Sequence, residues 1–269
     1  AGGGNGIGVA GSGVVVINEI DNDVRAAISG DDGGAAPAIA ADTITVDADD
    51  ASAISALAAA VAVSGAFSGG ASVAVSLGVS VAMNTIEGVT EAVVEGVDAG
   101  LDAETGLVRV EATDTGEISA LSAAAAVAFA VGGTAGVSIA GAGAWSENTI
   151  LSDVRARVDG SDVDAAGDVT VRAESSGDVT ALVASVAFAL GVGGTAGVAP
   201  ALGLSVARNF IGYGERTVAG TPIATTTFNL LTFEAEATTI RLGDLAAADH
   251  AGAPTPTLVE ISDGVRAGD

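Results

Sequence analysis

Long stretches without a single charged residue dominate this sequence: residues 51–86, 118–146 and 179–207. Each is long enough to raise the question of a transmembrane helix. Their internal pattern argues against one, because between Val73 and Met83 every second residue is large and the residues between are Ala, Ser or Gly. An α-helix would scatter the large side chains around its circumference, whereas a strand gathers them on one face. The pattern predicts long β-strands, although the Ala-rich run 56–62 leaves a helix open.

The two faces of such strands differ in bulk. We expect the large face to form the aliphatic core, with Trp145, Phe129 and Phe188 as fillers of that core. The face of Ala, Ser and Gly is nearly bare, so a second layer can approach it more closely than the ~10 Å usual for stacked sheets. Because both faces are apolar, cover is expected on both sides, from a solenoid interior or from neighbouring subunits.

A repeat runs through the chain. The motif Asn-x-Ile closes each apolar stretch, with spacings of 66, 64 and 61 residues, at Asn18, Asn84, Asn148 and Asn209. A glycine pair lies near the middle of each stretch, at Gly3-Gly4, Gly69-Gly70, Gly132-Gly133 and Gly193-Gly194. We interpret each stretch as a hairpin of two long strands that turns at the glycine pair, where positive φ is needed.

These units predict an all-β fold: an elongated β-solenoid-like or stacked-sheet repeat array with long Ala/Gly/Val hairpins. The array spans residues 1–214, in units of about 61–66 residues. The chain starts in mid-repeat, so we expect either a longer parent array or a missing strand supplied by a neighbouring subunit. Residues 215–269 match nothing upstream and are predicted to be a divergent terminal cap or junction.

Composition narrows the functional classes. The net charge of -25, with only 9 basic residues, argues against a nucleic-acid partner, because phosphates are bound by clustered cations. The absence of Cys excludes disulfides and thiolate metal sites. Aromatic residues make up only 3% of the chain, too few for a conventional enzyme core or for sugar-binding platforms. We therefore expect no enzymatic activity.

The segment Val79–Ile86, read Val-Ser-Val-Ala-Met-Asn-Thr-Ile, recurs with V-x-V-x-A before the apolar stretch and V-x-A-x-V after it. This combination resembles repeats in very large bacterial exoproteins of the haemagglutinin- or adhesin-like type, over residues 1–214. The resemblance implies a secreted or cell-surface location, an elongated β-rich architecture, and a role in cell contact, adhesion or an extracellular fibre. It brings no catalytic residues with it.

The four Asn residues of the repeat are the most specific polar feature. In stacked repeats, identical Asn side chains can hydrogen-bond to one another in a ladder. Asn is also favoured where a strand turns, through side-chain to backbone bonds, and the two roles can coexist. Either reading makes Asn18, Asn84, Asn148 and Asn209 structural.

Acidic groups recur in the predicted turns. Hard oxygen ligands suit Ca²⁺, and the candidate metal ligands are Asp21, Asp23, Asp159, Asp162 and Asp164. No EF-hand loop or glycine-rich nonapeptide Ca²⁺ repeat accompanies them. The competing interpretation, which we favour, is a solvated acidic surface that keeps the chain soluble and protects strand edges.

Two further residues lie near or in the tail. His250 lies beside Asp249, but no nucleophile motif accompanies it. Tyr213 is expected to mark the junction to the tail.

The sequence thus predicts a non-enzymatic structural or adhesive module that forms a stalk or filament by stacking of β units. The expected partners are copies of itself or adjacent repeats of a larger chain, together with cell-surface or matrix components. A Ca²⁺-dependent adhesin or surface-layer module is the alternative. A membrane-inserted β-hairpin assembly is disfavoured, because alternation of large with small residues suits no aqueous lumen.

Overall fold

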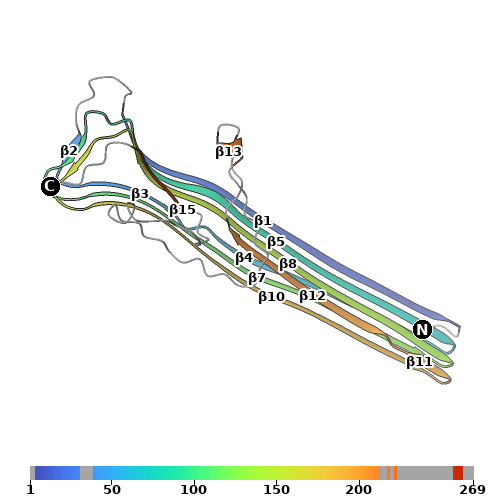
Figure 1. Ribbon diagram of the computed structural model, residues 1–269. Coiled ribbons are helices and arrows are strands. Elements are labelled where there is room, and N and C mark those ends of the chain that lie inside the picture. The colour runs from blue at the N-terminus through green and yellow to red at the C-terminus, as the bar shows by residue number, and fades with distance from the viewer. Residues whose placement is uncertain (1–3, 31–38, 213–216, 219–220, 223–256, 263–269) are drawn as a thin grey trace, which may run out of the picture.

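The computed structural model describes residues 4–30, 39–212, 217–218, 221–222 and 257–262. Nearly all of them are extended, in two sheets of long, nearly straight strands that form a flat, elongated molecule (Figure 1). No helix long and apolar enough to cross a membrane occurs in this part of the chain. The longest strands have 25 residues, which corresponds to about 80 Å at the usual rise of a strand.

Each sequence repeat forms one coil with two straight sides. One side is a strand of the first sheet, which runs to a glycine turn; the other is a strand of the second sheet, which runs back. The first sheet contains β3 (Ile44–Asp50), β4 (Ala53–Ser68), β7 (Val108–Gly132) and β10 (Val169–Gly193). The second contains β1 (Gly6–Ser29), β5 (Ala71–Glu95), β8 (Ala135–Asp159), β11 (Ala196–Val198) and β12 (Ala201–Gly212).

Successive coils pair in parallel and in register. Each residue of β7 lies beside its repeat equivalent in β10, as Val108 does beside Val169. The same holds in the second sheet, where β5 lies between β1 and β8. Equal side chains therefore stack in rows across the coils, so the fold is a parallel β-solenoid in which one repeat adds one layer.

Shorter strands complete the molecule. At the end opposite the glycine turns, β2 (Ile39–Ala41), β6 (Leu101–Ala103) and β9 (Val163–Ala165) form a small parallel sheet where the coils cross back. Beyond the repeats, β13 (Thr217–Val218) pairs with β14 (Thr221–Pro222), and β15 (Thr257–Ser262) pairs with the end of β8. Most of the predicted cap, 215–269, including His250, lies outside the described residues, as does Tyr213.

The glycine turns differ from the predicted hairpins. The chain does reverse there, but the strands on either side, such as β7 and β8, belong to different sheets and face each other. Their backbone groups are bonded to the neighbouring coils, so each reversal is an arch that joins two sheets. Positive φ is not the reason for these glycines; in the described chain it occurs at Gly96, Gly100 and Gly160, near the opposite end. Close stacking excludes a side chain at some of them, since a Cβ on Gly194 would lie 2.5 Å from the Gly133 carbonyl oxygen, whereas a Cβ on Gly4 or Gly69 would meet nothing within 4 Å.

The molecule has two halves along its strands. We call the half next to the glycine turns the tip half and the other the charged half. The interior of the charged half is aliphatic and includes Ile44, Val46, Val94, Leu101, Val108, Val110, Val154, Val158 and Val171. The interior of the tip half is made of small residues, among them Ala66, Ala74, Ala124, Ala126, Ala128, Ala130, Ala140 and Ala142.

In the tip half, the prediction that the large-residue face of each strand forms the core is wrong. The large side chains point outward: Leu57 is 66% exposed, Phe67 57% and Phe188 50%. Trp145 is 39% exposed and Phe129 is half-buried, so neither is a core filler.

The physical reason is how closely the two sheets approach each other. A Cβ on Gly78 of β5 would lie 2.6 Å from the backbone oxygen of Ala125 in the opposite sheet. A gap that cannot admit a methyl group at that position has no room for Leu or Phe. The bare faces expected to allow a close second layer therefore face each other across the interior.

Candidate functional site

The four repeat asparagines form a continuous ladder across the second sheet. The Asn18 amide donates to Asn84 Oδ1 at 2.8 Å, Asn84 to Asn148 at 2.7 Å, and Asn148 to Asn209 at 2.8 Å. Asn84 and Asn148 are fully buried, at the level where the tip half meets the charged half. Each inner amide both accepts and donates along the row, so the ladder fixes the register of neighbouring coils.

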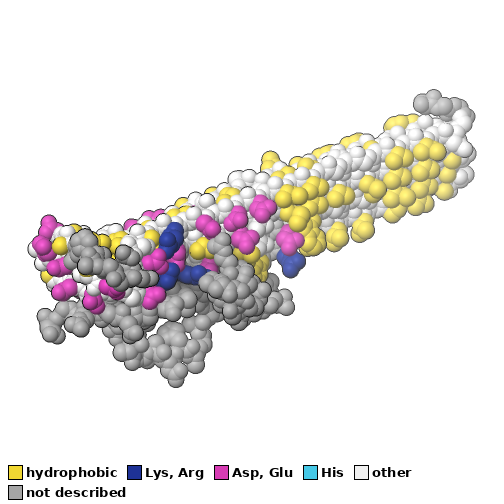
Figure 2. All heavy atoms as spheres, turned by 90° about the horizontal axis from the view of Figure 1, so that it is seen from above, with side chains coloured by type: hydrophobic (Ala, Val, Ile, Leu, Met, Phe, Trp, Pro, Cys, Tyr) yellow, Lys and Arg dark blue, Asp and Glu magenta, His cyan; other side chains and the backbone are white. Residues whose placement is uncertain are grey.

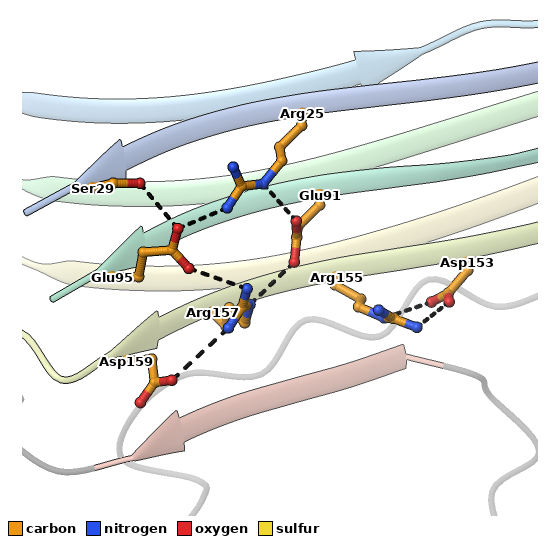
Figure 3. A network of polar contacts seen from close by, with 8 residues as sticks. All are labelled: Arg25, Ser29, Glu91, Glu95, Asp153, Arg155, Arg157 and Asp159. Atoms are coloured by element: carbon orange, nitrogen blue, oxygen red, sulfur yellow. Dashed lines mark hydrogen bonds and ion pairs between the residues drawn. The ribbon is translucent and has the colours of Figure 1, made fainter. Parts of the chain in front are cut away.

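An ion-pair network covers the second sheet in the charged half (Figure 3). Glu91 and Glu95 of the middle strand β5 lie between Arg25 of β1 and Arg157 of β8. Arg25 Nε donates to Glu91 at 2.8 Å and its Nη2 to Glu95 at 2.9 Å. Arg157 Nε donates to the other oxygen of Glu91 at 3.1 Å. The hydrogen bonds from Arg25 and from Ser29 lower the pKa of Glu95, so these side chains connect three coils.

Two carboxylates point inward in the charged half. Asp50 of β3 and Asp114 of β7 are both buried and are register partners. Asp50 accepts from Ser52 at 2.7 Å and from Asn22 at 3.1 Å, while Asp114 accepts from Ser152 at 2.8 Å. Burial raises the pKa of Asp114, the bond from Ser152 lowers it, and repulsion by Asp50 raises it. The sequence analysis did not identify this pair. The available signal was that both residues stand at positions of the alternation that face inward, whereas the other charged residues of these strands face outward.

Serines line the interior of the tip half. Ser80 Oγ lies 2.9 Å from Ser122 Oγ in the opposite sheet and donates to the Ala58 carbonyl at 3.0 Å. Among the described residues, several buried hydroxyls lack a partner: Ser64, Ser72, Ser76 and Ser138 in this half, and Thr90 in the charged half. Such hydroxyls fit where only small side chains fit.

The outer surface changes abruptly between the halves. In Figure 2, hydrophobic side chains form patches along the tip half, and Asp and Glu gather over the charged half. The change follows single strands: along β7, outward Glu111 and Glu117 are followed by outward Leu121 and Phe129. Large apolar side chains exposed on such a scale are the property of this molecule that most calls for a function.

The five aspartates predicted as Ca²⁺ ligands are not brought together. Asp21 and Asp23 lie on β1 beside Glu87 and Val89 of β5. Asp159, at the end of β8, lies in the row of Glu95 and Ser29, eight positions along the strands from Asp21, which is about 26 Å. Asp162 and Asp164 lie in the turn that follows and in β9. Within the described ranges, no group of three or more His, Asp or Glu side chains is placed to hold a metal ion.

No family model, curated protein or solved structure matches this chain. Its function is therefore inferred from the geometry. That geometry consists of stacked ladders, open sheet edges and an exterior divided between charge and apolar bulk. These are features of surfaces and assemblies.

Proposed function

We propose that this chain is a non-enzymatic structural and adhesive repeat module of an extracellular or cell-surface bacterial protein. Its coils stack along the axis perpendicular to the strands and build a stalk or filament. The partners along that axis are adjacent repeats of a larger chain or further copies of this one. The extracellular placement and the adhesive role are supported by the resemblance of residues 1–214 to bacterial exoprotein repeats.

One observation carries the proposal: each repeat adds one layer in register. The Asn ladder repeats from coil to coil, so a further coil would extend it, and the Arg–Glu network ties three successive coils together. At the ends of the described stack, β1 and β10 are edge strands of the two sheets. Edge strands present unpaired backbone groups that accept another strand, so the stack can be continued by identical geometry.

The proposal sets the dimensions of the assembly. Strands lie across the growth axis, so a long array is a ribbon about 80 Å wide that lengthens by about 4.8 Å per repeat. Adding ten copies of residues 85–148 after Asn148 should lengthen the particle by about 48 Å at constant width. Small-angle scattering and electron microscopy measure both dimensions, and fibre diffraction of aligned arrays should give a reflection near 4.8 Å along the ribbon.

The matched control carries the same ten segments with their residues shuffled, which keeps composition and charge but removes the register. The shuffled array should lose the regular ribbon. If the unshuffled array instead grows in width, or collapses to a compact particle, stacking along the axis is refuted.

A further inference from the structure

The outer face of the first sheet in the tip half is an apolar surface, which we call the tip face. Three strands, β4, β7 and β10, contribute to it, and their side chains align in rows. The rows are Leu57/Leu121/Leu182, Val61/Ala125/Val186, Val63/Val127/Phe188, Gly65/Phe129/Leu190 and Phe67/Val131/Val192. Phe129 and Phe188 also contact each other, with ring centroids 5.9 Å apart. No charged residue interrupts these rows.

The tip face has the size of the largest apolar patches on monomeric proteins, which are often functional. Three strands spaced by about 4.8 Å, over the eleven residues from Leu121 to Val131, cover about 500 Å². Monomeric proteins rarely leave more than a few hundred square ångströms of continuous apolar surface in water. A stable protein interface covers about 800 Å² per partner. The tip face of this chain approaches that size, and every added coil enlarges it by about 170 Å².

We infer that the tip face binds the tip face of a second copy of this chain, with the two sets of strands antiparallel. Such a pair is isologous, because the same surface is buried on both copies. The pairing buries a broad face, whereas stacking along the axis uses strand edges. An experiment can therefore rule out the pairing of tip faces and leave the stacking of coils intact, or the reverse.

Lipid is a poorer occupant because of the strand edges. The edge strand β1 runs along the whole tip half, and so does β10 in the first sheet. In hydrocarbon, each unpaired backbone group on such an edge costs several kcal/mol, whereas in water the edges remain hydrated. Pairing of two copies buries both tip faces and leaves the strand edges in water.

Charge determines the orientation. On the first sheet, the outward carboxylates lie beyond the tip face on the same strands, at Asp47, Asp49, Glu111, Glu117, Glu174 and Asp178. Parallel packing would bring these groups of two copies face to face, where like charges repel. Antiparallel packing about the middle of the tip face superposes the apolar rows and points the charged halves in opposite directions.

Two substitutions on one strand test the pairing. Val186 is 63% exposed on the tip face, and Ser176 is exposed on the same side of the same edge strand, in the charged half. Val186→Glu should raise the dimer dissociation constant at least about tenfold, because the carboxylate would be buried without a partner. Ser176→Glu should change it less than about threefold, since it adds an acid to a surface left in water.

Sedimentation equilibrium of the whole chain, from about 1 to 200 µM, measures these constants in the range expected for a small interface. Circular dichroism checks that both variants keep the β fold. Because both positions lie on β10, an effect through the edge would appear in both variants. Equal weakening by both, or a wild-type chain that is monomeric throughout, overturns the pairing.

Orientation has its own measurement, made simple by the absence of Cys from the chain. A spin label on Ser176→Cys should give an intermolecular distance of about 70 Å in the antiparallel pair, since the two labels lie about 22 residues apart along the strands. Parallel packing would bring the same labels within about 15 Å, close to the ~10 Å sheet spacing, and would contradict the inference. So would a monomeric chain that floats with phosphatidylcholine vesicles, which would identify lipid as the occupant.

Discussion

The two halves of each long strand solve the same packing problem in opposite ways. In the charged half, Val and Ile fill the interior while Arg and Glu cover the outside. In the tip half, Ala, Ser and Gly fill the interior and the large side chains are outside. The register is continuous from one half to the other, so the change lies in the side chains: in their volume inside the molecule and in their charge outside it. The difference teaches that parity along a strand fixes which residues share a face, while volume decides how close the sheets come.

The largest loss of stability is expected when side-chain volume is added to the thin interior of the tip half. Gly78→Val places a side chain where a Cβ already meets the Ala125 carbonyl. Overpacking of this kind costs about 1–3 kcal/mol or more, and we expect the upper end because the obstacle is backbone. The melting temperature should fall by several degrees.

Gly143→Val is the matched control. Gly143 lies beside Val79 on the outer side of the same sheet, and nothing lies within 4 Å of the position that a Cβ would occupy there. Its melting temperature should change little. If the two variants melt alike, the close approach of the sheets is not what selects glycine.

The boundary between the halves depends on the Asn ladder. Asn84→Ala removes a buried amide that accepts from Asn18 and donates to Asn148, leaving the buried Asn148 oxygen without that donor. An orphaned buried polar group costs about 1–3 kcal/mol. Denaturant unfolding should show this loss for Asn84→Ala and a smaller one for Asn209→Ala, because Asn209 is at the end of the ladder and more exposed. Equal losses would mean that the ladder does not act as a row.

The buried acid of the charged half should respond to pH. Burial raises the pKa of Asp114 in the folded chain above its unfolded value. Stability is therefore reduced above the folded pKa and is recovered as pH falls through it. Asp114→Asn keeps an oxygen to accept from Ser152 and removes the charge, so it should raise the melting temperature at neutral pH by a few degrees. The gain should shrink in acid, and a gain independent of pH would contradict the role of the charge.

The smallest effect is expected on the charged exterior. The pKa of Glu95 is lowered by Arg25, so its contribution is present above the unfolded pKa and is lost as pH falls through the folded one. Glu95 is about one-third exposed, and solvent screens such pairs to about 0–1 kcal/mol. Glu95→Gln should lower stability by no more than this in dilute buffer, and by less in 1 M NaCl. A larger loss, unaffected by salt, would indicate packing instead.

Period-two alternation was sufficient to predict an all-β repeat fold, because no helix places Val73 to Met83 on one face. It could not say which face is inside, and the assumption that large residues form the core was wrong. The missing evidence was in the sequence: Glu111 and Glu117 have the same parity as Leu121 and Phe129. Most charged side chains of β7 face water, with the buried Asp114 as the exception, so a continuous strand carries the large residues of the same parity outward with them.

Other features needed three-dimensional information. A reversal at two glycines is compatible with a hairpin or an arch, and only the pairing of β7 with β10 across coils distinguishes them. The spacing of the four Asn residues indicated a ladder, and the structure gives its bonds. The aspartates chosen as Ca²⁺ ligands were expected in turns, but Asp21 and Asp23 lie within β1, several residues along the strands from the row of Asp159.

The uneven distribution of charge has a mechanical consequence for a long array. Like-charged carboxylates in successive coils repel along one margin of the ribbon only, and the arginines between them offset part of that repulsion. The opposite margin carries no such force, and its neighbouring coils attract. In the proposed ribbon, this imbalance should bend the array with its apolar margin on the concave side, and the radius of curvature should increase as salt screens the charged margin.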